Sequence, residues 1–119
     1  YMKHGADAIE IRKQWDEAFD IPVFPTVSIG WDDTPRFPAK GAQDVSRFHQ
    51  TPQAFATFLQ VAKEYADAHP EQKPEGRRFV YINAWNEWVE GSYLLPDRLN
   101  GFGYLEAVRD VIIEGKYNK

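Results

Sequence analysis

The residues best suited to chemistry lie in one short stretch late in the chain. Glu87 and Glu90 are three residues apart, and Trp85, Asn86 and Trp88 stand beside them. A pair of carboxylic acids with separated pKa values is the standard equipment for glycosidic bond cleavage, in which one donates a proton and the other stays ionised. Tryptophan faces suit the apolar face of a pyranose. The stretch therefore predicts a sugar-cleaving site, although solvated loop glutamates beside core tryptophans would have the same sequence.

A second polar stretch runs from Trp31 to Arg36. In an extended segment Asp32 and Asp33 point in opposite directions, so no more than one of them faces a given ligand. A ring-stacking Trp31 and a hydroxyl-binding aspartate would suit a sugar, and Arg36 could pair with an aspartate or bind an anion. The alternative is an ordinary turn, because Asp-Thr-Pro is common turn chemistry.

Other catalytic patterns are missing from the sequence. His4, His49 and His69 lie far apart without metal-ligand spacing, so we expect no metal site. Neither a glycine-rich phosphate loop nor a GxSxG serine motif is present, and there is no cysteine to act as a thiolate. We therefore expect a site that works without a metal or another cofactor.

Composition narrows the class of partner. The 119 residues carry a formal net charge of −4, which argues against nucleic acid as a partner. No apolar run approaches the roughly 20 residues that span a bilayer, so we expect no membrane insertion. Aromatic residues make up 15% of the chain, which fits either a packed core or a site with flat walls. Composition alone does not decide between these two, and the carbohydrate that we expect as partner follows from the positions of the residues described above.

The elements that must position these residues follow from periodicity. Helical spacing of apolar residues predicts a first helix that ends before Asp20 and Pro22. A Thr51 cap and Pro52 begin a second helix, which continues to about Ala68. A third helix starts near Tyr104 and stops at Gly115. Two apolar runs, 23–29 and 79–85, read as strands, and the second is of the kind buried on both faces of a parallel sheet. The apolar face expected on the first helix comprises Ala8, Ile11, Trp15, Ala18 and Phe19.

This order of elements predicts an α/β fold with parallel strands and helical crossovers. Both long loops follow strands, and the carboxyl ends of parallel strands are where such folds place their sites. Two strands make a poor sheet, so we expect residues 1–119 to be part of a larger α/β domain.

The same residues carry a family resemblance. The run 82–97, which includes Asn86-Glu87-Trp88-Val89-Glu90-Gly91, resembles the signature of the WbsX-type, glycoside hydrolase family 99-like proteins. The upstream Gly30–Arg36 and the closing 103–107 match that group in the same order, from about Pro22 to the end of the chain. The resemblance implies that residues 1–119 are a C-terminal fragment of one catalytic domain. The fragment would supply a helix and about two strand–loop–helix units of a (β/α)8 TIM barrel. The N-terminal part of the barrel would be needed to complete the domain.

The resemblance also implies roles. Characterised relatives are retaining, endo-acting α-mannosidases and mannanases, so Glu87 would act as the base that deprotonates the sugar 2-hydroxyl and Glu90 as the acid/base. Trp31, Asp33 and Trp88 would line the sugar subsites. We expect four further residues of the matching segments to contact the substrate: Arg36, Trp85, Asn86 and Tyr93.

One departure and two alternatives accompany this prediction. Relatives commonly carry glutamate where this chain has Leu95, so a subsite that uses that glutamate would differ here. Another branch of the group is labelled glycosyltransferase, which leaves transfer in surface-polysaccharide assembly as an alternative to hydrolysis. A catalytically silent carbohydrate-binding fragment is the third possibility. The resemblance slightly favours a secreted or periplasmic location.

Overall fold

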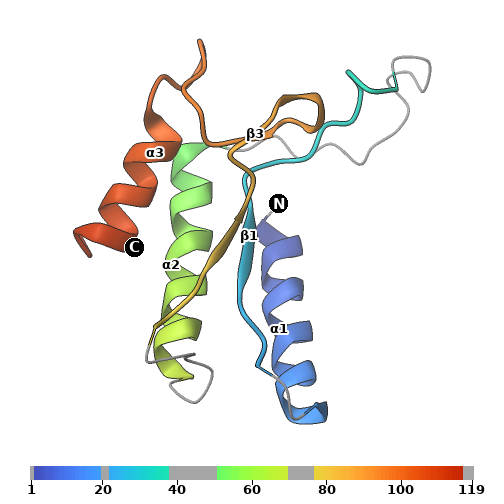
Figure 1. Ribbon diagram of the computed structural model, residues 1–119, viewed down its shortest axis with the longest axis vertical. Coiled ribbons are helices and arrows are strands. Elements are labelled where there is room, and N and C mark those ends of the chain that lie inside the picture. Colours follow the sequence, from blue (N-terminus) through green and yellow to red (C-terminus); the bar gives the residue numbers. More distant parts are fainter. Residues whose placement is uncertain (1, 20–21, 38–50, 70–76, 117–119) are drawn as a thin grey trace.

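A computed structural model describes residues 2–19, 22–37, 51–69 and 77–116, and all structural statements below concern these residues. Three helices and two small sheets make up the fold (Figure 1). The elements in chain order are α1 (Met2–Ala18), β1 (Thr26–Ser28), α2 (Pro52–Ala68), β2 (Tyr81–Asn83), β3 (Asn86–Glu87), a 3-10 turn η4 (Trp88–Glu90), β4 (Ser92–Tyr93), α3 (Gly103–Val108) and a π-helical turn η5 (Arg109–Ile113).

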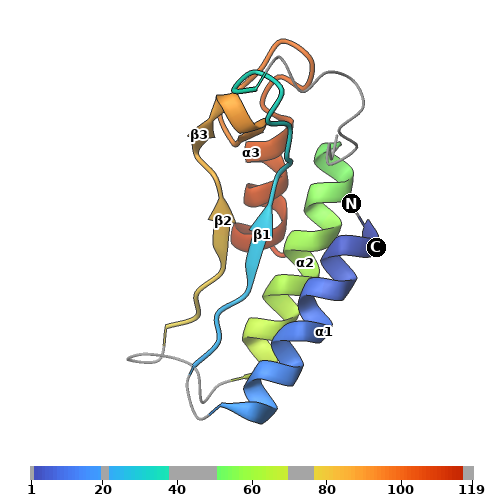
Figure 2. The ribbon, with the colours of Figure 1, turned by 90° about the vertical axis from the view of Figure 1, so that its right-hand side faces the viewer.

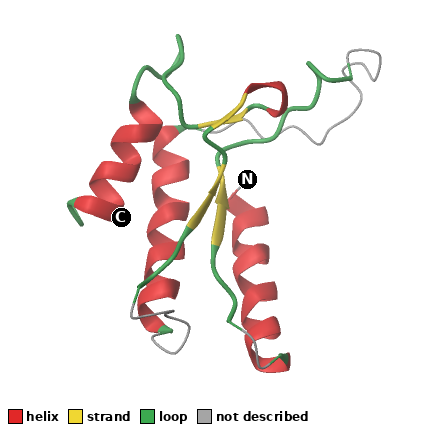
Figure 3. Cartoon of the chain, in the orientation of Figure 1, coloured by secondary structure: helices red, strands yellow, loops and turns green. Residues whose placement is uncertain are grey.

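The centre of the fold is a β1–α2–β2 unit. Strands β1 and β2 pair in parallel with Thr26 opposite Tyr81, Val27 opposite Ile82 and Ser28 opposite Asn83. Helix α2 connects them, as a parallel pair requires. The cartoon in Figure 3 shows the two strands side by side between the helices. The mixed helix-and-strand class and the parallel pairing are therefore as predicted.

Helix α2 confirms its sequence signals most closely. The side chain of Thr51 accepts a hydrogen bond from Ala54 N (3.1 Å), and Pro52 occupies the first turn. These two features satisfy or remove backbone donors that would otherwise lack partners at the start of the helix. Phe55 and Leu59 on its inner face are fully buried.

The core lies on one side of the parallel strands. Val27 and Ile29 point toward α2, and Val80 and Ile82 pack against the same cluster. Tyr104, Ala107 and Val111 close it from the last helical segment. In Figure 2 the strands lie on one side and α1 and α2 on the other. The helices therefore cover one face of the sheet.

The opposite face corrects one expectation. Thr26 and Tyr81 point away from the helices and are exposed, so β2 is covered on one face, not two, within the described chain. Phe24, Phe79 and Tyr81 gather there as edge-to-face neighbours, with centroids 5.8 Å apart for Phe24–Phe79 and 6.1 Å for Phe24–Tyr81. Only alternate residues of the apolar run that contains β2 therefore pack against the helices.

Helix α1 corrects a second expectation. Ile11, Trp15 and Phe19, predicted to share one apolar face that would suit packing against the rest of the fold, are about half exposed. Half-buried Arg12 lies on the inner side and donates a hydrogen bond from Nη2 to the carbonyl oxygen of Thr26 (2.8 Å). Burial lowers the pKa of Arg12 from its ordinary value. The apolar stripe of α1 therefore faces solvent.

Several boundaries also differ from the prediction. Regular pairing covers only three residues of each predicted strand, since Pro25 has no N–H to extend the ladder. The end of the second run instead folds into the short β3–β4 pair. The last helix ends in a π-helical turn before Gly115, which has the expected positive φ of 61°. Among the described residues, no helix combines the length and apolarity needed to cross a bilayer.

Candidate functional site

Two loops meet at the carboxyl edge of the parallel pair. The first, residues 29–37, follows β1, and the second, residues 84–93, follows β2. Because β1 and β2 are parallel, both loops leave the sheet at the same edge, at the top of Figure 1. This is the place predicted for the site.

Backbone atoms join the two loops. Asp32 N donates a hydrogen bond to the carbonyl oxygen of Glu90 (2.7 Å). Gly91 follows with a φ of 60°, and a Cβ at this position would lie 3.2 Å from Asp32 Cβ and 3.3 Å from Asp32 N. A glycine therefore permits both the left-handed conformation and the close approach of the first loop.

The second loop is a small hairpin. Asn86 pairs with Tyr93 and Glu87 with Ser92 in antiparallel register, and the 3-10 turn Trp88–Glu90 connects them. The carbonyl oxygen of Trp85 accepts hydrogen bonds from Leu94 N (3.0 Å) and Leu95 N (3.3 Å). The sequence predicts only a loop after the strand here, without a hairpin. Gly91 followed by Ser92 was the one available sign of a tight turn.

The first loop is held by its own aspartates. The Oδ1 atom of Asp32 accepts hydrogen bonds from Thr34 N (3.0 Å) and, at very short range, from Thr34 Oγ1. The carbonyl oxygen of Asp33 accepts hydrogen bonds from the backbone N–H groups of Arg36 and Phe37 (3.0 Å each). The predicted turn chemistry is therefore present, and it presents Arg36 to the hairpin.

Arg36 brings the two glutamates together. Its Nη1 atom lies 2.6 Å from Glu90 Oε1 and its Nη2 atom 3.5 Å from Glu87 Oε1. The Glu90 side chain is 15% exposed, whereas those of Glu87 and Arg36 are 41% and 45% exposed. The partners of Arg36 are thus the two glutamates, not the aspartate that the sequence suggested as one option.

An aromatic cavity of about 320 Å³ lies beside these charges. Trp88 and Tyr93 stack with ring centroids 4.0 Å apart, and Tyr104 meets Tyr93 edge-on at 6.4 Å. Asp32 lies in the wall of the cavity. The remaining lining residues are Ile29, Gly30, Pro35 and Gly91. Apolar ring faces next to a carboxylate are a combination that suits a sugar ring.

Two tyrosines and an aspartate form an electrostatic group at the cavity. Burial and a hydrogen bond to Asp97 raise the pKa of Tyr93. Burial, with the nearby charges of Tyr93 and Asp97, raises the pKa of Tyr104 to about 12. Burial opposes ionisation of Asp97, but hydrogen bonds from Asn100, Leu99 and Tyr93 outweigh it and lower the pKa of Asp97. Tyr104 and Asp97 were not predicted as site residues, although both lie in the segments that carry the family resemblance, 103–107 and 82–97.

A buried polar network supports the strand ends below the loops. Asn83 Nδ2 donates hydrogen bonds to Ser92 Oγ (3.2 Å) and Ser28 Oγ (3.4 Å). Ser92 is fully buried, and its hydroxyl donates to the carbonyl oxygen of Asn83 (2.5 Å). The network links β1, β2 and the hairpin.

The predicted substrate-contacting residues fall into two groups. Trp88 and Tyr93 line the cavity, and Arg36 contacts the glutamates. Trp31 and Asp33 are half-buried in the first loop, while Trp85 and Asn86 are exposed on the second. These four are not among the described residues that line the cavity. Of the seven, Arg36 is the residue seen in contact with both glutamates, and Trp88 and Tyr93 line the neighbouring cavity, whose described lining includes neither Glu87 nor Glu90.

The histidines add little to this site. His69, at the end of α2, stacks on Tyr65 with centroids 4.1 Å apart, and its Nδ1 lies 2.7 Å from the carbonyl oxygen of Tyr65. His49 lies outside the described residues, as does the environment of the His4 side chain. Within the described ranges, no cluster of three or more histidine, aspartate or glutamate side chains could hold a metal ion.

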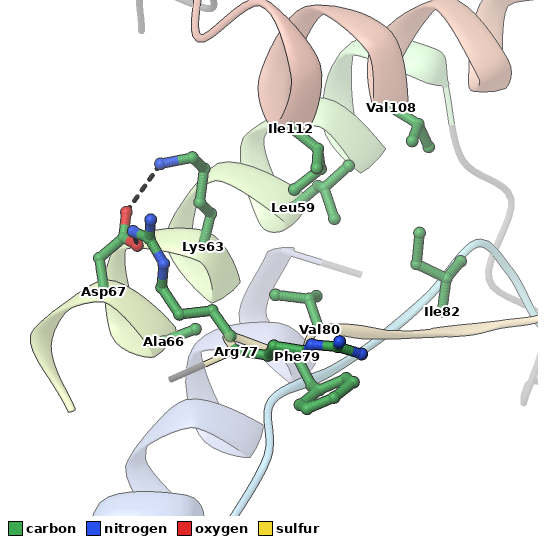
Figure 4. Close-up of a pocket in the computed structure, with 11 residues that line it drawn as sticks. Leu59, Lys63, Ala66, Asp67, Arg77, Phe79, Val80, Ile82, Val108 and Ile112 are labelled. Atoms are coloured by element: carbon green, nitrogen blue, oxygen red, sulfur yellow. Dashed lines mark hydrogen bonds and ion pairs between the residues drawn. The ribbon is translucent and has the colours of Figure 1, made fainter. Parts of the chain in front are cut away.

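A larger cavity of about 660 Å³ lies away from the loops, between α2, β2 and the last helical segment. Figure 4 shows apolar side chains converging on it from three elements, among them Leu59, Ile82 and Ile112. At its rim Asp67 pairs with Lys63 (2.7 Å) and with Arg78 at very short range. Its lining is mainly aliphatic and offers no pair of facing carboxylates.

Comparisons with known proteins agree with the motifs. The family described as Glycosyltransferase WbsX matches residues 5–108. Uncharacterized protein WxcX from two strains of Xanthomonas campestris, B100 and ATCC 33913, is 36% identical over 93 residues. The match covers 78% of this chain but only 12% of each relative, so the chain spans a small part of the length of these curated relatives. No solved structure matches.

Proposed function

Because this chain belongs to the WbsX glycosyltransferase family, a family of carbohydrate-active proteins, we propose that it carries the catalytic glutamates of an enzyme that cleaves glycosidic bonds in a polysaccharide or oligosaccharide. The observation that carries the proposal is the position of Glu87 and Glu90. Both contact one guanidinium at the carboxyl edge of the parallel strands, beside an aromatic cavity.

The proposed chemistry divides between the two carboxylates. Glu90, the more buried of the two, donates a proton to the leaving glycosidic oxygen. Glu87 takes the proton of the sugar 2-hydroxyl, whose oxygen then attacks the anomeric carbon as the glycosidic bond breaks. Water opens the resulting 1,2-anhydro sugar and returns both glutamates to their starting states. Trp88 and Tyr93 pack on the apolar face of the sugar.

The charge of the site favours a neutral glycoside as substrate. Among the described residues that form the cavity wall and the ion pairs, Asp32, Glu87 and Glu90 contribute three carboxylates, and Arg36 contributes one guanidinium. A cleft with excess negative charge repels an anionic ligand. A sugar nucleotide with its diphosphate is therefore the less favourable donor for these residues.

We also propose that the chain is part of a (β/α)8 barrel. Its β1–α2–β2 unit is parallel, its helices lie on one face, and its site loops leave the carboxyl ends of the strands. The uncovered face with Thr26 and Tyr81 would then point into the barrel. The rest of the barrel would supply the remaining sugar subsites. Specificity for α-mannosides would depend on those subsites.

The test is a mass-spectrometric screen for oligosaccharides released from α-mannans and mixed bacterial polysaccharides by the full-length protein. We expect release by the wild type, and a loss of at least about 100-fold in the Glu90→Gln and Glu87→Gln variants. Glu106→Gln, on the exposed side of α3, is the matched control and should cleave at the wild-type rate. Equal release by wild type and Glu90→Gln would remove Glu90 from the reaction.

Glycosyl transfer is the second candidate, and the description of the matching family favours it. In transfer, a sugar hydroxyl replaces water as the acceptor while both glutamates keep their roles. Products longer than the starting oligosaccharide would identify transfer. Absence of both shorter and longer products would contradict catalysis and would leave sugar binding, which calorimetry with the same glycans measures.

A further inference from the structure

We propose that Arg36 is a positioning residue that holds the carboxylates of Glu87 and Glu90 in a single arrangement through the two arms of its guanidinium. The family resemblance predicts that Arg36 contacts the substrate, whereas the geometry shows contacts with the glutamates themselves. The inference rests on the proposed function, because it assigns a task within the same cleavage reaction.

The contacts use separate atoms of the guanidinium. Nη1 lies 2.6 Å from Glu90 Oε1, and Nη2 lies 3.5 Å from Glu87 Oε1. A guanidinium is planar, so its two terminal nitrogens have a fixed separation and direction. Two carboxylates that contact the two nitrogens are therefore oriented relative to each other.

Arg36 is itself held in place by the backbone. Its N–H donates to the carbonyl oxygen of Asp33 (3.0 Å), within the turn that Asp32 closes through Thr34. Asp32 N is bonded in turn to the carbonyl oxygen of Glu90 (2.7 Å). The backbone segments that carry Arg36 and Glu90 thus belong to one hydrogen-bonded unit built from both loops, and the ion pairs of their side chains lie on that unit.

Stability alone does not account for this arrangement. Arg36 and Glu87 are nearly half exposed, and ion pairs at that exposure contribute little to folding. Such a pair can affect the reaction rate strongly by orienting the carboxylates, since a displacement of about 1 Å in reacting groups can reduce a rate by about 100-fold.

The experiment compares Arg36→Ala and Arg36→Lys in the full-length protein with Arg109→Met as a matched control. Arg109 also faces two carboxylates, Asp110 (2.7 Å) and Glu114 (3.8 Å), but lies in the last helical segment away from the site. We expect Arg36→Ala to lower kcat about 100-fold with KM changed less than about threefold. Arg36→Lys should keep about a tenth of the activity, because an ammonium is a point charge without the fork.

Two further readouts separate positioning from other roles. Added guanidinium ions should restore part of the kcat of Arg36→Ala and none of that of Glu90→Gln. Crystal structures should show Glu87 and Glu90 in new orientations in Arg36→Ala and in their original ones in Arg109→Met.

The outcomes distinguish this inference from the proposed function. Loss of activity in Glu90→Gln with full kcat in Arg36→Ala overturns the positioning role and leaves the cleavage reaction standing. A rise in KM alone makes Arg36 a substrate-binding residue and also overturns it. If the wild type cleaves nothing, the crystal structures decide: reoriented carboxylates uphold positioning without the proposed function, and unchanged carboxylates reject both.

Discussion

At the scale of single residues, the charged and hydroxyl groups of the site interact in two small groups. Glu87 and Glu90 belong to one sequence motif, and Arg36, about 50 residues earlier in the chain, contacts both. Tyr93 and Tyr104 form a second group with Asp97, which lies between them in the sequence. The first group therefore depends on a partner distant in sequence and the second on a near one.

The raised pKa of Tyr104 predicts how the stability of the fold depends on pH. Its pKa is about 12 in the folded chain, against an ordinary value near 10, with burial as the main cause. Between these values the unfolded chain loses a proton that the folded chain keeps. This contribution to the free energy of unfolding is therefore complete below about pH 10 and is lost as the pH rises toward about 12.

Urea unfolding of the wild type and Tyr104→Phe between about pH 9 and pH 11 measures this effect. We expect the free energy of unfolding of the wild type to fall more steeply with pH than that of the variant, which lacks the ionisable group. Parallel pH profiles for the two proteins would contradict the raised pKa.

At the scale of elements, the hairpin and the first loop act as one piece because Gly91 lets them approach. A Gly91→Ala change should destabilise the chain by about 1–2 kcal/mol, because the residue has a φ of 60° and its new Cβ would crowd Asp32 at 3.2 Å. Gly101→Ala is the matched control: its φ is 57°, but no atom lies within 4 Å of the added Cβ.

Both variants place a side chain at a positive φ, so the difference between their free energies of unfolding measures the contribution of the contact between the loops. Chemical unfolding gives the free energies, and hydrogen exchange at Asp32 N reports the bond to Glu90. Faster exchange in Gly91→Ala than in Gly101→Ala is the expected result. Equal destabilisation with equal exchange would show that the contact between the loops contributes nothing.

Elements with local signals were predictable from the sequence. Helix α2 has its cap, its proline and its apolar stripe within one segment, so its bounds were predicted closely. Helix α1 was predicted with its apolar face, but that face is exposed in the described chain, where Arg12 bonds to β1 from the other side. The β3–β4 hairpin was missed because two-residue strands carry no periodicity.

The candidate site was predictable in place and in part of its content. Polar loops after two apolar runs marked the carboxyl edge, and the Glu87–Glu90 spacing marked the carboxylates. The bridging role of Arg36 and the buried Asn83–Ser92 pair were not predictable. Both depend on contacts between segments about 50 or 10 residues apart, which only the fold defines.

At the scale of the whole molecule, the fold leaves apolar surface on its open sheet face. Phe24, Phe79 and Tyr81 form an aromatic cluster there, and contiguous apolar patches of this kind mediate association. We expect the 119-residue chain alone to self-associate as its concentration rises, and the Phe79→Ser, Tyr81→Ser double variant to associate less.

Analytical ultracentrifugation across a concentration series measures this association. Leu99→Ser is the control, since Leu99 is 90% exposed on a loop tip outside the cluster, and an isolated apolar residue has little effect. A wild-type chain that stays monomeric at all concentrations, or an equal response in both variants, would contradict the prediction.

The hydrogen bond from Asp32 N to the carbonyl oxygen of Glu90 has an evolutionary consequence. It joins the loops through main-chain atoms, so the side chain at position 90 can be exchanged while the joint remains. A descendant that lost this glutamate would keep the backbone joint and the aromatic cavity. Under the proposed function, one substitution would then convert a sugar-cleaving protein into a sugar-binding one without rebuilding the fold.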